Sequence, residues 1–288
     1  MEDLIATVAI ILAVSFLFSF GIGFAIGDEI AWGDIEPLEG EAVNELRPDY
    51  DLGACRNLEG DVSVILYFMQ DFESDWSFTE ILNFTTNEVV PALEFLEAQA
   101  ADYGVYLNFE IVDSHWYIPY KGTVVTEPKK EGSYTIDVLF DVARFRGLLS
   151  DHQLLAKKQE EFGTEVICLT IFNKEGVGYT LNPSRGDDTN VAEHCIVFSR
   201  DPGSTNESFY GYQASLIAAE ILYLYGAEKL YATPEREELA SSHYPYDVML
   251  DSYYNVWENE IDDATAFYIG WLDEAPRVLY QEGWKIEN

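Results

Sequence analysis

The stretch "AAEILYLYGAEKLY", residues 218–231, decides how this sequence is interpreted. It is apolar or aromatic apart from three charged residues, and its spacing predicts a buried helix over about 213–227. Glycine readily takes the left-handed conformation that ends many helices, so Gly226 is the expected C-terminal cap. Glu220 is then an acid on an otherwise apolar helix, which makes it the first candidate for a functional side chain.

The residues around Glu220 have the spacing of a zinc-binding helix without its ligands. Positions i and i+4 share a helix face, so in His-Glu-x-x-His two imidazoles reach one zinc ion and the glutamate polarises its bound water. Ala219 and Tyr223 take the two histidine positions here, and Lys229 takes the position of a third ligand. Alanine has no lone pair, a phenol has a pKa of about 10, and an ammonium repels a dication. We therefore expect no metal cofactor at this helix.

Four other segments extend the pattern along the chain. They are "ILYFMQDFESDWSFTEI" (65–81), "IFNKEGVGYTL" (171–181), "HYPYDVML" (243–250) and "IDDATAFYIGWLDEAP" (261–276). Together with "GAEKLY" they resemble a bacterial group of zincin-type zinc metallopeptidases. That group has His-Glu-x-x-His-x-x-Gly-Ala-x-Asp-Leu-Tyr, then Tyr-Pro-x-Asp-Ile-Met, then Thr-Ala-Tyr-x-Ile-Gly-Trp. The resemblance covers about residues 59–276.

The resemblance implies an inactive metallopeptidase homologue that keeps the scaffold and has lost the metal. Met249 matches the methionine turn beneath the metal, and Glu220 is a remnant of the general base. The former substrate cleft is expected to bind a peptide or protein, added as a strand to an edge near 177–181 or 194–199. Two alternatives stay open: a residual metallohydrolase that uses Glu220 with unidentified ligands, and a purely structural cell-surface protein.

Loss of the metal raises the question of what balances Glu220. A carboxylate in a partly buried site without compensation is costly or has a raised pKa. One hypothesis is that the Lys229 ammonium occupies the vacated position and pairs with Glu220 at ~4 Å or less, with a hydrogen bond from the Tyr223 hydroxyl. The alternative is that Lys229 points into solvent.

The composition excludes some classes of partner. The chain has 288 residues, 48% of them hydrophobic, and 52 acidic against 16 basic residues give a net charge of -36. Such a surface repels phosphate backbones, so we expect no nucleic-acid partner. The acidic excess is typical of a soluble surface, with calcium binding by loops such as "RGDDTN" (185–190) as the alternative.

Cysteines and histidines add no metal motif. Cys55, Cys168 and Cys195 lack Cys-x-x-Cys spacing, and no two of the four histidines are four residues apart. Cys168 and Cys195 lie in two apolar runs, where either two buried free thiols or a disulfide between neighbouring strands is conceivable; free thiols are favoured.

The N-terminus predicts membrane attachment. Leu4 to Gly27 is uncharged and apolar, and its 24 residues at ~1.5 Å each span roughly 36 Å, enough to cross a bilayer core. An uncleaved single-span anchor is favoured over a signal peptide cleaved after Ala25-Ile26-Gly27. Either way, the body is expected outside the cytoplasm. Basic residues are too few near the span to set its orientation by charge.

The remaining chain divides into an acidic linker, 28–58, and a body, 59–288. Strands are predicted at 61–69, 105–112, 165–172 and 194–199 from their β-branched and aromatic content. Helices are predicted at 77–104, 134–163 and 213–227, followed by a helical C-terminal part. Strands alternating with long helices indicate a single α/β domain, which the resemblance makes zincin-like with a mixed sheet.

Overall fold

The computed structural model describes residues 58–72, 74–119, 163–181, 194–200, 212–250, 255–281 and Trp284. All of them belong to one compact unit, Leu38–Asn288. Its described centre is a five-stranded sheet in the order β2-β1-β3-β5-β4. The strands are β1 (Gly60–Gln70), β2 (Leu107–Pro119), β3 (Glu165–Glu175), β4 (Tyr179–Leu181) and β5 (His194–Arg200).

The sheet is mixed, as predicted. β1, β2, β3 and β5 pair in parallel, whereas β4 pairs antiparallel to β5. Each of the four predicted strands overlaps one of the parallel strands. β4 follows β3 after a short turn and is the last of the described strands, so within the described sheet the predicted edge near 177–181 is confirmed. The other predicted edge is wrong, because β5 is enclosed between β3 and β4.

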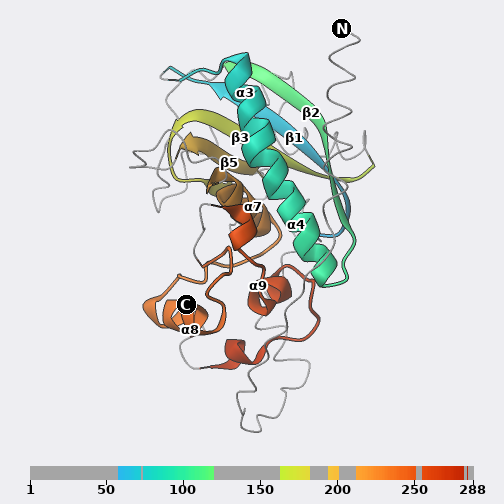
Figure 1. Ribbon diagram of the computed structural model, residues 1–288, viewed down its shortest axis with the longest axis vertical. Helices are drawn as coiled ribbons and strands as arrows, with labels where there is room; N and C mark the ends of the chain where they lie inside the picture. Colours follow the sequence, from blue (N-terminus) through green and yellow to red (C-terminus); the bar gives the residue numbers. More distant parts are fainter. Residues whose placement is uncertain are drawn as a thin grey trace. The chain divides into compact units, whose positions relative to one another are not determined.

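Helices cover one face of the sheet. They are α3 (Phe78–Phe84), a π-helical turn (Thr85–Val89), α4 (Val90–Asp102) and α7 (Tyr212–Leu224). Figure 1 shows α4 crossing in front of β1 and β2, with α7 nearer β5. Alternate residues of the strands pack against these helices, among them Val64, Leu66, Ile167, Leu169 and Val197. The residues between them, on the opposite face, are buried as well, for example Ile65, Tyr67, Phe172 and Phe198.

The helix predicted over 77–104 is confirmed, with one distortion. Ser77 and Glu80 form the predicted capping box, and Gly104 ends the helix at φ +74°. Pro91 explains the π-helical turn in the middle. Proline has no N–H and its ring meets the carbonyl four residues earlier, so a widened turn relieves the clash. Glu88 lies in this turn and is buried.

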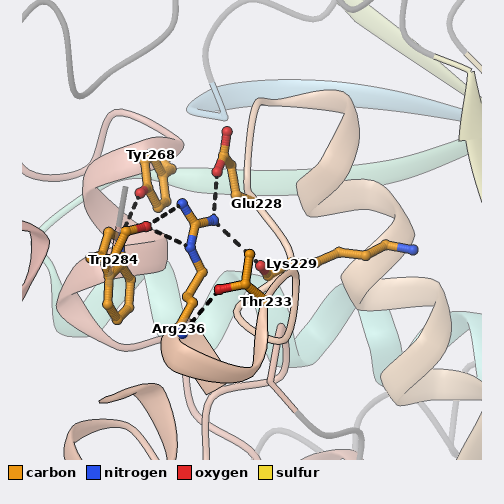
Figure 2. A network of polar contacts seen from close by, with 6 residues as sticks. All are labelled: Glu228, Lys229, Thr233, Arg236, Tyr268 and Trp284. Atoms are coloured by element: carbon orange, nitrogen blue, oxygen red, sulfur yellow. Dashed lines mark hydrogen bonds and ion pairs between the residues drawn. The ribbon is translucent and has the colours of Figure 1, made fainter. Parts of the chain in front are cut away.

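Short helices and turns make up the C-terminal part, and a buried arginine joins them. α8 (Pro234–His243) begins at the cap Thr233, and α9 (Asp263–Tyr268) follows. The Arg236 guanidinium donates to the Trp284 carbonyl at 2.8 and 2.9 Å and to Glu228 at 2.7 Å. The Trp284 indole donates to the Tyr268 hydroxyl at 2.9 Å, as Figure 2 shows. Arg236 therefore ties α8 to Trp284 and to the segment after α7, and Trp284 in turn is bonded to α9.

The two cysteines of the sheet lie on neighbouring strands but do not bond. Leu169 of β3 is the register partner of Cys195, so Cys168 points to the opposite face of the sheet. Neither cysteine forms a disulfide, and both are fully buried. The favoured prediction of two free thiols is confirmed.

Several predictions fall on residues that are not described. They concern the apolar run 4–27, nearly all of the linker 28–58, Cys55, the loop 185–190 and the helix expected at 134–163. Among the described residues, no helix is both long enough and apolar enough to span a membrane.

Candidate functional site

The α7 helix holds the first candidate residues in a buried turn. Ala219, Glu220 and Tyr223 are only 8, 8 and 7% exposed. The helix start is fixed by Glu88, whose carboxylate accepts the Ala214 N–H at 3.0 Å. An anion at the first turn of a helix satisfies a free N–H and complements the helix dipole. The helix ends as predicted, since Gly226 has φ +99°.

Glu220 is bound to the edge strand. The Thr180 hydroxyl lies 2.6 Å from Glu220 Oε2 and 2.7 Å from the Glu220 carbonyl oxygen, and it donates to this pair of acceptors. Gly178 runs so close that a β-carbon there would lie 3.4 Å from the Glu220 side chain. Because side chains alternate along a strand, Gly178 and Thr180 face α7, while Tyr179 lies near the Phe198 ring. The carboxylate is therefore fixed by β4.

Cys195 lies on the same face of the sheet as Thr180 and is close to the Thr180–Glu220 contact. Its sulfur lies 3.9 Å from the Thr180 hydroxyl oxygen. Burial, and next the Glu220 carboxylate, raise the pKa of the Cys195 thiol well above its usual value. It therefore stays a neutral thiol, and nucleophilic chemistry by this sulfur is unfavourable.

Lys229 does not pair with Glu220. No ion pair joins them in the part of the chain that the structure describes, so the salt-bridge hypothesis is wrong. The Lys229 ammonium instead lies over the Tyr223 ring, 5.2 Å from its centroid, and 5.6 Å from that of Tyr231. The cause is the turn at Gly226, after which the chain leaves the helix axis. Figure 2 shows the Lys229 side chain extending away from Arg236. The backbone carbonyl of Lys229 accepts a hydrogen bond from the Arg236 guanidinium at 3.5 Å.

Met249 lies in the same core as α7. It is 2% exposed, and its carbonyl accepts the Leu230 N–H at 3.2 Å, just after the helix. Its own N–H donates to Asp247 at 2.7 Å. The turn that contains Met249 is thus packed against the segment that carries Lys229.

Thr180 is the residue of this site that sequence reasoning missed. Its partner is forty positions away in sequence, and nothing in "GVGYT" marks the hydroxyl as functional. Across the described ranges, no group of three or more histidine, cysteine or acidic side chains is arranged to hold a metal ion. His243 lies in α8 with its ring Nδ1 3.0 Å from the Leu239 carbonyl oxygen.

Comparison with known proteins adds no relative. No protein-family model matches the chain, and no curated protein matches it. The geometry of α7 and β4 therefore has to carry the functional argument.

Proposed function

We propose that this protein is a pseudopeptidase, a zincin-type scaffold without its zinc that binds an extended peptide or protein segment along β4. One observation carries the proposal: β4 ends the described sheet, antiparallel to β5, directly against the helix turn of Ala219, Glu220 and Tyr223. A strand with a single strand neighbour offers backbone groups to an added strand. Within the described sheet, β5 is that single neighbour.

The contacts of Glu220 favour binding over hydrolysis. A general base has to reach a water molecule or a substrate proton. Glu220 is buried and accepts the Thr180 hydroxyl, and the side chains at 219, 223 and 229 offer no strong zinc ligand. The carboxylate then serves to fix β4 against α7, which keeps the edge strand rigid for a partner.

Peptide selection tests the proposal directly. The body, residues 28–288, is used to select from phage-displayed linear peptides, and a selected peptide is resynthesised with single N-methyl groups along its backbone. Strand addition predicts loss of binding at alternate positions, because every second N–H of an added strand bonds the edge. Indifference to N-methylation, or no enrichment over bait-free selection, would refute strand addition.

A matched pair of variants places the binding. Val177, 42% exposed and two residues before β4, is replaced by arginine, and Leu82, 54% exposed on α3, serves as the control. Val177→Arg should weaken the selected peptide at least tenfold while Leu82→Arg leaves it unchanged. Equal effects of the two substitutions would place the peptide elsewhere.

We further propose that the run 4–27 anchors the chain in a membrane with the body outside the cytoplasm. The length and apolarity of the run support this. Protease added to intact cells should digest the body. A body that stays protected until the cells are lysed would show that this orientation is wrong.

A further inference from the structure

A second cluster, separate from the α7 contacts, surrounds Asp247. This aspartate is 0% exposed and lies in the turn 244–250. One of its oxygens accepts the Met249 N–H at 2.7 Å, and the other accepts the Asp262 N–H at 2.9 Å. Two backbone hydrogen bonds also join this turn to Glu260. The Val248 N–H donates to the Glu260 carbonyl, and the Glu260 N–H donates to a carbonyl of the turn. A single carboxylate therefore joins the turn that carries Met249 to the start of α9.

The titratable groups around Asp247 and Asp262 are acids and phenols, and the Thr265 hydroxyl also faces Asp247. Asp262 and Asp263 come from the start of α9, and Glu260 from the segment before it. Tyr103, after α4, and Tyr244, after α8, face the same carboxylates, and burial foremost raises the pKa of both phenols. Among the described residues, none of the basic side chains forms an ion pair with this cluster.

The environment favours protonated carboxyls. Burial raises the pKa of Asp247 to about 6, against the two amide hydrogen bonds and the Thr265 hydroxyl, which lower it. Burial, and then the charge of Asp247, raise the pKa of Asp262 to about 7. The first proton removes the repulsion between these two carboxylates while both N–H bonds to Asp247 remain.

We propose that Asp247 and Asp262 form a proton-dependent latch that holds the turn 244–250 to the start of α9 at mildly acidic pH and loosens at higher pH. A carboxyl whose pKa is higher in the folded than in the unfolded chain binds its proton more tightly when folded. Stability linked to the latch is therefore complete below the ordinary aspartate pKa of 3.8, falls as the pH rises above that value, and is lost once the pH has passed about 6 to 7. The latch rests on these contacts alone and is independent of peptide binding.

The pH dependence of one substitution tests the latch. Unfolding of the full chain in detergent micelles with EDTA is followed by urea titration for the wild type and Asp262→Asn between about pH 5 and pH 8. At about pH 8 the unfolding constant of the variant should be at least tenfold smaller, because it lacks the buried charge. The ratio of the two constants should be at least tenfold larger at about pH 8 than at about pH 5, because the folded wild type loses its proton from Asp262 over this range and the asparagine does not titrate.

Two further variants control for the chain's general negative charge. Asp273→Asn removes the same charge from an exposed position, so its effect should not vary with pH in this way. Glu260→Gln is measured alongside, in case Asp262→Asn fails to fold. It should also be more stable than the wild type at high pH, and this difference in stability should shrink as the pH falls. Hydrogen exchange at the Asp262 amide, corrected for intrinsic rates, should slow at acidic pH. A difference between wild type and Asp262→Asn that is constant with pH would overturn the latch.

Discussion

At the scale of single residues, Glu220 shows how a buried acid is held at a helix that lacks metal ligands. The expected partner was the cation of Lys229, and the Thr180 hydroxyl is instead one of the partners that the structure shows. A hydrogen bond from a hydroxyl stabilises the charged form of a carboxylate. The Lys229 ammonium instead makes cation–π contacts with tyrosine rings, in which a cation lies over the ring face.

Removal of the Thr180 hydroxyl should therefore destabilise the body. Thr180→Val keeps the shape of the side chain and takes a hydrogen bond from a buried carboxylate, at a cost of about 1.5–3 kcal/mol in the free energy of unfolding. Urea unfolding of the body measures this cost. Thr180→Ser, which keeps the hydroxyl, is the matched control and should lose less. Equal stability of the valine variant and the wild type would show that the bond contributes nothing.

At the scale of elements, hydrophobic pattern predicted most of the sheet and α7. β3 and β5 are short runs of β-branched and aromatic residues, and they are buried on both faces, as central parallel strands are. The capping box at Ser77 and the stop at Gly104 are local signals and were predictable for that reason. The Thr180–Glu220 bond was not, because it depends on how β4 meets α7 across forty positions of sequence.

The π-helical turn was missed for a different reason. Pro91 lies inside a segment with helical spacing, and the pattern alone does not show whether the helix breaks, kinks or widens. The widened turn places Glu88 where it can bond the Ala214 N–H at the start of α7. A local distortion in one helix thus fixes the end of another.

Arg236 should be the most sensitive basic residue among those described in the C-terminal part. Arg236→Met keeps much of the side-chain volume but removes the guanidinium donors from the Trp284 carbonyl and Glu228. We expect the free energy of unfolding to fall by roughly 2–4 kcal/mol. Arg277→Met removes the same charge from an exposed position and should cost under about 0.5 kcal/mol. Thermal unfolding of both variants measures the difference. Similar melting temperatures for the two would contradict the structural role of Arg236.

At the scale of the whole molecule, the proposed scaffold can be tested by restoring what it is proposed to have lost. Positions 219 and 223 share a helix face, and the Lys229 ammonium already lies 5.2 Å from the Tyr223 ring centroid. The scaffold proposal predicts that side chains at all three positions can reach a common point.

We expect the triple variant Ala219→His, Tyr223→His, Lys229→His to bind about one zinc ion per chain, because three imidazoles meet the ligand count of a catalytic zinc site. Elemental analysis after dialysis measures zinc content, and thermal unfolding with and without zinc measures the stabilisation by binding. The wild type should retain no stoichiometric zinc, and Ala219→His alone should bind it weakly. A folded triple variant with no more zinc than the single variant would show that these positions do not converge.

The opposite orientations of Cys168 and Cys195 give the two faces of the sheet separate chemical reporters. An alkylating reagent reacts with a fully buried thiol only after that part of the protein opens, so the alkylation rate measures the opening free energy around each sulfur. Cys195 lies opposite Thr180 in the pairing of β4 with β5, whereas Cys168 is on the other face. In single-cysteine variants, a peptide bound along β4 should slow alkylation of Cys195 and leave that of Cys168 unchanged. Mass spectrometry of the modified chains then detects occupancy of the edge strand without a label on the peptide.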